Sequence, residues 1–345
     1  MTSTTELLCV SPDKPNNMLV LKPCPQSSDP TSSTTILPTS YHNLYPNVLI
    51  LPSKHVKPTP FRHDTFTDHY SLGRSIGVGG YGEVFIALHD FQGTVHAVKH
   101  IPEHRCKHKT YCDKRGIKVP LEVALWEPLC NPGIIKLQDV FFENNTWILV
   151  MEYDEDFTDL FNHARDIYPF NLSSSTCKKI ILQLIDIIQY LDQQSVDHRD
   201  IKDENILYNP STNEIKLIDF GSASPLDSQP YTTYKGTDCY IPPEFWKTYS
   251  YSSHFATVFS IGCFYYVLLT GNTPFKDRDE VEAYSGSLEE TSNFDESSFT
   301  KHEHWFVEKC LCPEPNDRMK LNHMADLIED VQSSGYDADL QDDES

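Results

Sequence analysis

Two stretches of the sequence hold side chains whose types and spacing suit phosphate chemistry. "HRDIKDENIL" places Asn205 five positions after Asp200, and "KLIDFGSA" adds Asp219 further along the chain. A carboxylate can accept or orient the proton of a substrate hydroxyl, while an amide oxygen and a second carboxylate can hold magnesium against phosphate groups. The chemistry that this pattern indicates is the transfer of a phosphoryl group to a hydroxyl.

A glycine-rich stretch could supply further phosphate contacts. "IGVGGYGEV" has Gly77, Gly79 and Gly82 in G-x-G-x-x-G spacing, and it lies between two β-like runs, which disfavours a dinucleotide-binding fold. Glycine lets backbone N–H groups approach phosphate oxygens closely, and Tyr81 at the loop tip could act as a flap. Because glycine-rich hairpins are also common in purely structural turns, this motif is informative only together with Lys99 of the next predicted strand, "VHAVKH".

The elements that must position these residues divide the sequence into two parts. Short β-like runs such as "GEVFIALHD", "TVHAVKHI" and "TWILVMEY" fill the first part and predict an antiparallel sheet. The second part contains "TCKKIILQLIDIIQYLDQQ", whose apolar residues recur at helical spacing, and "FATVFSIGCFYYVLLTG", which is apolar nearly all round. We expect the latter to form a buried central helix rather than a membrane span.

Composition limits the partners and the compartment. The formal net charge of the 345 residues is −22, which opposes binding to nucleic acid or anionic membranes and favours a basic partner. The ten cysteines form no dense even framework and no signal peptide is visible, so we expect a reduced intracellular setting, cytoplasmic with the nucleus as a second location. His104, Cys106, His108 and Cys112 match no standard zinc spacing and indicate a polar loop with free thiols.

The four motifs, taken in order, resemble those of a eukaryotic protein kinase of the serine/threonine type, from about Tyr70 to about Val331. The resemblance implies an α+β bilobal fold, with an antiparallel sheet and an αC helix in the N-lobe and a mostly helical C-lobe. The boundaries we expect are a disordered Ser/Thr/Pro-rich leader over 1–65, the N-lobe over 66–153, the C-lobe over 154–332 and an acidic disordered tail over 333–345.

The resemblance also implies a role for each motif residue. A lysine and a glutamate pair, an aspartate orients the substrate hydroxyl, a second lysine steadies the transferring phosphate, and two further residues hold Mg²⁺ beside ATP. The matching positions here are Lys99, Glu122, Asp200 and Lys202 for catalysis, and Asn205 and Asp219 for the metal.

The stretch "MEYDEDFTDLF" matches the kinase hinge, with Met151 as the gatekeeper beside the adenine pocket. The backbone of Glu152 to Asp154 is implied to meet the adenine edge, and apolar side chains are implied to sandwich the ring. The nucleotide contacts implied by the resemblance are Gly77, Val78, Gly79, Gly80, Tyr81, Gly82, Val84, Ala97, Lys99, Glu152, Asp154 and Leu207.

Among the serine/threonine kinases, the sequence resembles the Pim kinases in particular. The central helix has Thr257 and Phe259 in "TVFSIG", where most kinases carry Asp and Trp, and Pim kinases also lack that aspartate. The hinge is one residue longer than usual, as in Pim kinases, but Asp154 stands where they carry a proline. Since proline has no N–H, we expect this chain to make the ordinary two-hydrogen-bond adenine contact that a proline prevents.

Acidic residues indicate the class of substrate. Asp159 and Glu204 match positions that contact arginine in the substrates of basophilic kinases, so we expect a monomer that phosphorylates Ser or Thr in Arg/Lys-rich proteins. "GTDCYIPPEF" resembles the segment that receives the substrate, with Thr237 reaching Asp200. Its Glu244 should form a structural ion pair with Arg318.

Several alternatives stay open. Thr232, Thr233 and Tyr234 could be phosphorylated or be ordinary loop hydroxyls, and we favour the second reading because Pim kinases are active without such phosphorylation. The basic insert "HRCKHKTYCDKRGIK" could dock an acidic partner or the tail, although a solvated loop is expected. A pseudokinase or scaffold would keep the fold without catalysis, but none of the six catalytic and metal residues is substituted.

Overall fold

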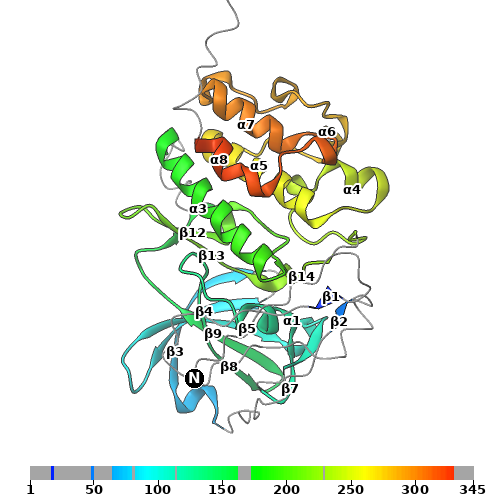
Figure 1. Ribbon diagram of the computed structural model, residues 1–345. Coiled ribbons are helices and arrows are strands. Elements are labelled where there is room, and N and C mark those ends of the chain that lie inside the picture. Colours follow the sequence, from blue (N-terminus) through cyan, green and yellow to red (C-terminus); the bar gives the residue numbers. More distant parts are fainter. Residues whose placement is uncertain are drawn as a thin grey trace, which may run out of the picture. The chain divides into compact units, whose positions relative to one another are not determined.

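The computed structural model describes residues 17–18, 48–49, 64–79, 82–112, 115–161, 172–227 and 230–329 (Figure 1). The chain forms two compact units, the first made of 1–158, 190–199 and 205–228, and the second of 159–189, 200–204 and 229–345. The tail over 333–345 and most of the leader lie outside the described residues. In the leader, strands β1 (Asn17–Met18) and β2 (Val48–Leu49) pair in parallel.

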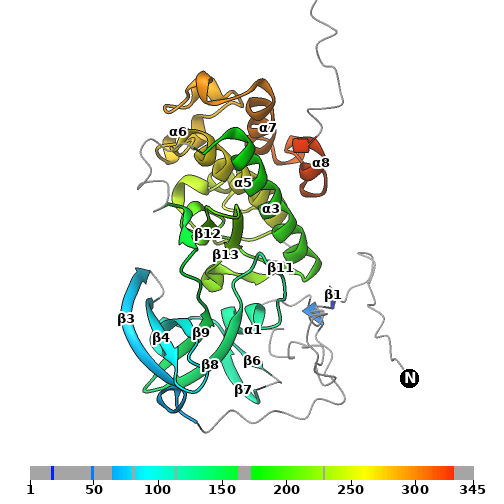
Figure 2. The ribbon, with the colours of Figure 1, turned by 90° about the vertical axis from the view of Figure 1, so that its left-hand side faces the viewer.

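The first unit is built on a five-stranded antiparallel sheet, which can be followed in Figure 2. Side chains alternate between its two faces, and one face is covered by η2 (Phe66–Asp68), whose Phe66 packs on Tyr70, Phe141 and Val150. In spatial order the strands are β3 (Tyr70–Gly79), β4 (Gly82–His89), β5 (Val95–Pro102), β9 (Thr146–Glu152) and β8 (Leu137–Glu143).

The basic insert between β5 and the next helix is folded, so the expectation of a solvated loop was wrong. After η3 (Glu103–Arg105) it forms an antiparallel hairpin of β6 (Lys109–Cys112) and β7 (Ile117–Pro120). Thr110 and Val119 pair across the hairpin and are both buried, so one face has a packing partner that the charge pattern did not reveal. The hairpin leads directly into α1 (Leu121–Trp126), in which all six residues are buried.

Short strands complete the first unit and carry the motif residues near Asp219. β12 and β13 form an antiparallel hairpin, and β11 pairs with β14. The bounds of these elements are β11 (Val196–Asp197), β12 (Ile206–Asn209), β13 (Glu214–Leu217), η5 (Phe220–Ser222) and β14 (Ser224–Pro225). Two further short elements, β10 (Thr158–Asp159) and η4 (Asp203–Asn205), each have residues in both units.

The second unit is helical. Helix α3 (Ser174–Gln193) buries the predicted apolar stripe, and α5 (Ser253–Thr270) packs on α7 (Lys301–Leu311) (Figure 1). Among the described helices α5 is the one long and apolar enough to cross a membrane, but 72% of it is buried inside the protein, which confirms the predicted core helix. The other elements are η6 (Asp238–Tyr240), α4 (Pro243–Thr248), α6 (Arg278–Ala283), η7 (Leu288–Glu290), η8 (Glu296–Ser298), η9 (Pro315–Asp317), η10 (Leu321–His323) and α8 (Met324–Glu329).

The expected ion pair between Glu244 and Arg318 forms in the core of the second unit. The two guanidinium nitrogens donate to the two carboxylate oxygens of Glu244 over 3.0 and 2.9 Å. Arg318 also donates to the carbonyl oxygens of Cys312 and Phe255, and its side chain is 0% exposed. Through these bonds the buried Arg318 links the segment that is expected to receive the substrate, which contains Glu244, to α5 and to the loop after α7.

We therefore predict that Glu244→Gln destabilises the protein by about 3 kcal/mol, because a buried guanidinium loses its counter-charge. Glu282→Gln is the matched control, since it weakens the exposed pair of Arg278 and Glu282 on α6 and should cost much less than Glu244→Gln. Urea unfolding measures both free energies. Equal losses for the two variants would show that the buried pair has no special structural role.

Candidate active site

One face of the five-stranded sheet carries four residues that the sequence placed at the nucleotide site, which are Val84, Ala97, Lys99 and Met151. Val84 on β4 pairs with Lys99 on β5, and Ala97 on β5 pairs with Met151 on β9. Residues 97 and 99 point to the same side of the strand, so their cross-strand partners share that side. Lys99 thus stands beside a lining of apolar side chains, while the remaining predicted wall residue, Leu207, lies on β12.

Lys99 is the centre of a three-residue charge cluster. Its ammonium nitrogen lies 2.9 Å from Oδ1 of Asp219 and 3.5 Å from Oε1 of Glu122. Lys99 and Glu122 are both buried, at 8% and 9% exposure, so the cluster is held largely out of water. The sequence-predicted partner Glu122 is present, but the shorter contact is with Asp219.

The pKa values in this cluster follow from burial and from its unequal distances. Burial alone would lower the pKa of Lys99, but the carboxylates of Glu122 and Asp219 outweigh it and raise that pKa. Burial also tends to raise the pKa of Asp219, yet the cation of Lys99 and hydrogen bonds lower it overall. For Glu122 burial prevails over Lys99, and its pKa is raised. The charge on Asp219 therefore stabilises the fold, whereas the charge on Glu122 costs stability.

Asp219 has a left-handed backbone, with φ of 63°, which a non-glycine residue adopts only when its surroundings hold it there. Its Oδ1 accepts the N–H of Gly221, and the next side chain, Phe220, is packed between two rings. The ring of Trp126 stacks on Phe220 at a centroid distance of 5.7 Å, and that of His198 meets Phe220 edge-on at 5.0 Å. These contacts fix the carboxylate of Asp219.

Trp126 was not predicted from the sequence as a site residue. It lies four positions after Glu122 on α1, a spacing that puts both side chains on one side of a helix, and this was the available signal. Its indole N–H donates to the carbonyl oxygen of Ile135 over 2.6 Å, so the ring has a fixed orientation.

Asn205 and Asp219 are brought together through the backbone of Ile218. The N–H of Ile218 donates to the carbonyl oxygen of Asn205 over 3.0 Å, and the carbonyl oxygen of Ile218 lies 3.0 Å from Nε2 of His198. Oδ1 of Asp219 accepts from Lys99 and Gly221, while its Oδ2 has no hydrogen-bond partner among the described residues. A carboxylate oxygen and an amide oxygen are donors that Mg²⁺ accepts, and the backbone of Ile218 links the two residues that carry them.

The predicted hinge is anchored through the side chain of Glu152. Its Oε1 lies 2.8 Å from the ammonium nitrogen of Lys216 on β13 and accepts the N–H of Lys136. Lys216 is a residue that the sequence did not reveal, because no local pattern links it to the hinge. The next residues turn sharply, with Asp154 accepting the N–H of Asp156 on its side chain and that of Phe157 on its carbonyl. Within the described part of the chain, the N–H of Asp154 has no partner.

The glycine-rich stretch joins β3 and β4, as predicted. Gly77 pairs with Val84 and Gly79 with Gly82, while Val78 is 80% exposed. A Cβ on Gly82 would overlap the carbonyl oxygen of His100, so only glycine fits there. The loop tip, Gly80 and Tyr81, lies outside the described residues.

In the second unit, Asp200, Lys202 and Thr237 form a triangle. The ammonium nitrogen of Lys202 lies 3.3 Å from Oδ2 of Asp200 and donates to the hydroxyl of Thr237 over 2.9 Å. The hydroxyl of Thr237 in turn donates to Oδ1 of Asp200 over 3.4 Å. The structure thus brings the hydroxyl of Thr237, 37 residues further along the chain, to the carboxylate of Asp200 and the neighbouring ammonium of Lys202.

The predicted substrate-binding acids and their neighbour Asp203 differ in exposure. Glu204 is exposed, whereas Asp159 at the end of β10 and Asp203 are both partly buried. The hydroxyl of Tyr240 donates to Oδ1 of Asp203 over 3.4 Å. Burial, and then the neighbouring Glu204, raise the pKa of Asp203 to about 7. Asp203 therefore gains its charge near neutral pH, which no sequence motif indicated.

The predicted regulatory hydroxyls differ in exposure. Thr232 and Thr233 are exposed, whereas the hydroxyl of Tyr234 donates to the carbonyl oxygen of Tyr240 over 3.1 Å. Tyr234 packs against a cluster that includes Phe245 and Tyr251, and burial raises its pKa far above the ordinary value. A bound and packed Tyr234 is a poor target for modification while the segment keeps this fold.

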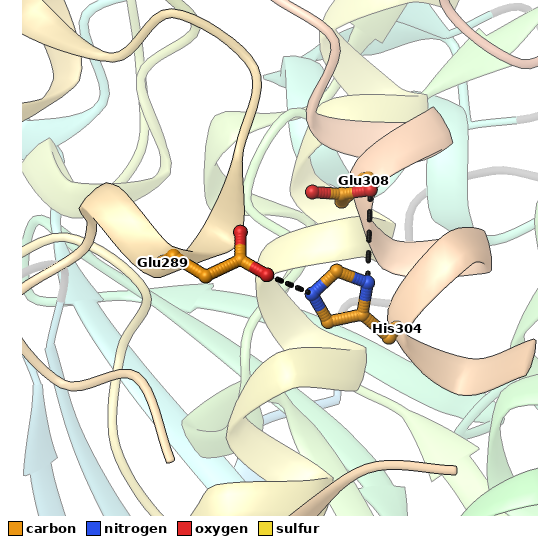
Figure 3. Close-up of side chains that lie close together, drawn as sticks. All are labelled: Glu289, His304 and Glu308. Carbon is orange, nitrogen blue, oxygen red and sulfur yellow. Dashed lines mark ion pairs between the residues drawn. The ribbon is translucent and has the colours of Figure 1, made fainter. Parts of the chain in front are cut away.

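Figure 3 shows another group of possible metal ligands, Glu289, His304 and Glu308. The two carboxylates approach opposite nitrogens of the imidazole, at 3.3 Å for Nε2 and 3.6 Å for Nδ1. A metal ion needs a ring nitrogen as a lone-pair donor, but here both nitrogens face acceptors, an arrangement that suits N–H donation. The group therefore connects η7 to α7 without forming a convincing metal site.

The charge cluster predicts opposite effects on stability for two neutral isosteres. At pH 7, Asp219→Asn should lower the free energy of unfolding by about 1–3 kcal/mol, because a charged hydrogen-bond acceptor is lost. Glu122→Gln should leave it unchanged or higher, because the raised pKa of Glu122 makes its charge costly above the ordinary value of 4.5.

The effects of the two variants on the free energy of unfolding also depend differently on pH. The lowered pKa of Asp219 means that its contribution is complete above the ordinary value of 3.8, so its loss in Asp219→Asn should be equal at pH 5 and pH 7. Any gain from Glu122→Gln should shrink toward pH 5, where Glu122 approaches protonation. Urea unfolding at both pH values measures this, and equal penalties for the two variants would contradict the assignment.

Comparisons with known proteins agree with this geometry. The protein kinase domain family matches residues 70–327. Serine/threonine-protein kinase pim-2 of Danio rerio is 31% identical over 286 residues, which cover 80% of this chain and 89% of the relative. Serine/threonine-protein kinase prk-2 of Caenorhabditis elegans is 30% identical over 217 residues, covering 63% of this chain and 48% of the relative.

A more distant relative is 3-phosphoinositide-dependent protein kinase 1 of Arabidopsis thaliana, which is 29% identical over 268 residues, 74% of this chain and 52% of the relative. The matched region thus spans about half the length of the nematode and plant proteins. The family match covers most of the chain, and the sheet and helices are those the resemblance implied. This chain belongs to the protein kinase family and is a protein serine/threonine kinase similar to the Pim kinases.

Proposed function

We propose that this kinase transfers the γ-phosphoryl group of ATP, with Mg²⁺, to serine or threonine in Arg/Lys-rich proteins. Members of the family generally use ATP and Mg²⁺. The observation that carries the proposal is the contact of buried Lys99 with Oδ1 of Asp219, which leaves Oδ2 of Asp219 without a partner in the described part of the chain. Lys99 then meets the α- and β-phosphates, while Asn205 and Asp219 hold the metal.

The triangle in the second unit supplies the other half of the chemistry. Asp200 accepts or orients the substrate hydroxyl, and Lys202, which already lies 3.3 Å from it, spreads the charge that develops on the transferring phosphoryl group. The hydroxyl of Thr237 is hydrogen-bonded to both side chains and so fixes their positions relative to each other. A pseudokinase or scaffold has no need of these contacts, so catalysis is the better reading.

The substrate preference rests on charge. Asp159, Glu204 and the pH-sensitive Asp203 are acids of the second unit, and the whole chain carries a net charge of −22. Carboxylates of this kind favour arginine and speed the approach of basic peptides. The same charge opposes nucleic acid and anionic membranes, and we propose a monomer acting in the cytoplasm and also the nucleus.

For the nucleotide we propose two hinge hydrogen bonds. The Glu152 carbonyl accepts from the adenine amino group, and the N–H of Asp154 donates to the ring. Support comes from the side-chain anchor of Glu152 on Lys216 and from the Asp154 N–H, which has no partner in the described part of the chain.

Phosphate transfer to a basic serine peptide tests the catalytic assignment. Asp200→Asn should reduce kcat by at least about a hundredfold, as expected for loss of a positioned general base. Asp186→Asn, an exposed change on α3, serves as the matched control and should retain full activity. If Asp200→Asn kept the wild-type rate, or if the folded wild type transferred no phosphate, the proposed function would be wrong.

The pKa of Asp203, raised to about 7, predicts that KM for a basic peptide depends on pH. Between pH 6 and pH 8, KM for an arginine-rich peptide should fall by about twofold to fivefold as Asp203 ionises, in keeping with one partly exposed charge pair. Asp203→Asn should remove most of this change, while Asp238→Asn, at an exposed position of the same region, should not. A peptide array in which acidic peptides outrank basic ones would overturn the preference itself.

The proposed hinge contact predicts different KM values for ATP for two substitutions of Asp154. Asp154→Pro removes the N–H and should raise KM for ATP about fivefold, the effect of one lost hydrogen bond. Asp154→Ala keeps the N–H and should behave like the wild type. Indistinguishable KM values for the two variants would show that Asp154 does not donate to the nucleotide.

A further inference from the structure

One face of the β6–β7 hairpin is exposed to solvent in the described part of the chain. Tyr111 pairs across the hairpin with Lys118, and both are exposed, whereas the neighbouring pair of Thr110 and Val119 is buried. Because strand side chains alternate, Tyr111 and Lys118 stand together on the solvent side. Arg105 and Lys107, just before the hairpin, are exposed as well.

This face is basic on a strongly acidic protein. Two nearby basic side chains form ion pairs: Nζ of Lys109 lies 2.5 Å from Oε1 of Glu103, and Nη2 of Arg115 lies 2.7 Å from Oε1 of Glu127. Arg105, Lys107 and Lys118 have no ion pair with any residue in the described ranges, although the chain as a whole carries −22. Three cations without an ion pair in the described ranges, one opposite the exposed Tyr111 and two just before the hairpin, form a local exception to the charge of the molecule.

We propose that this face, made of Arg105, Lys107, Tyr111 and Lys118, docks an acidic peptide segment of a partner protein. Carboxylates complement the three cations, and the Tyr111 ring, which is 38% exposed, offers apolar contact beside them. The net negative charge of the chain opposes such a segment elsewhere, so these cations favour the hairpin as its binding place. The basic substrates proposed above are excluded from the same face by like charge.

The hairpin is joined to both ends of α1, which gives docking a route to the active site. The N–H of Leu121, the first residue of α1, donates to the carbonyl oxygen of His108 over 3.0 Å. At the other end Arg115 makes two hydrogen bonds to Glu127, the C-cap of α1. Since α1 carries Glu122, a peptide that orders the hairpin also restricts Glu122 relative to Lys99.

A titration with a labelled octaglutamate peptide tests the docking face by fluorescence anisotropy on the full chain. We expect saturable binding that weakens as salt rises, and that falls about tenfold when three exposed charge pairs are lost. The variant that reverses the face is Arg105→Glu, Lys107→Glu and Lys118→Glu. The matched control reverses three exposed lysines of the second unit, Lys179→Glu, Lys301→Glu and Lys320→Glu, and changes the net charge equally.

Weakening by the face variant alone supports the proposal. Equal weakening by both variants would reduce the binding to general charge attraction and overturn it, as would equal binding of an octaglutamine peptide or no saturable binding by the wild type. Circular dichroism and peptide phosphorylation without added acidic peptide verify that both variants are folded and active.

Coupling to α1 is tested by linkage on the wild type. If docking restricts Glu122, a non-hydrolysable ATP analogue should tighten octaglutamate binding, and the peptide should tighten analogue binding by the same factor. Glu127→Gln, which removes the charge and one of the two acceptors that Glu127 offers to Arg115, should reduce that factor without abolishing docking. An octaglutamate affinity that is independent of the analogue would contradict the coupling.

Discussion

The contact between Lys99 and Asp219 is the interaction on which the phosphate-handling unit depends. It joins β5 of the five-stranded sheet to the chain that follows β13, two segments 120 residues apart in sequence. Burial penalises all three charges of the cluster, and the 2.9 Å contact offsets this for Lys99 and Asp219 but not for Glu122. The cluster therefore holds one strongly favoured pair and one weaker, adjustable contact, which is where a change in α1 has most effect.

The strained backbone of Asp219 is held by contacts that contribute no chemistry themselves. Trp126 and His198 pack on Phe220, and the backbone of Ile218 is bonded by both His198 and Asn205. Together these restrict the residue before and the residue after Asp219. In the other unit Thr237 does the same for Asp200 and Lys202. In both units, preorganised charges are positioned before any substrate arrives, which lowers the reorganisation required during reaction.

The sequence predicted the residues that chemistry demands at fixed spacing, and it predicted the elements with strong periodicity. The buried helix α5, the antiparallel sheet and the pair of Glu244 and Arg318 are examples. It did not predict contacts that arise only when distant segments meet, such as the stack of Trp126 on Phe220 or the anchor of Lys216 on Glu152. The hairpin in the basic insert was missed because its charges masked a strand pattern with one buried face.

Calorimetric titration of ATP into the folded protein, with and without Mg²⁺, tests most directly whether the pair of Lys99 and Asp219 builds a metal–nucleotide site. We predict that Mg²⁺ tightens ATP binding by the wild type, and that Asp219→Asn loses this enhancement while retaining metal-free binding. Equal ATP affinity of the wild type in the presence and absence of Mg²⁺ would contradict it.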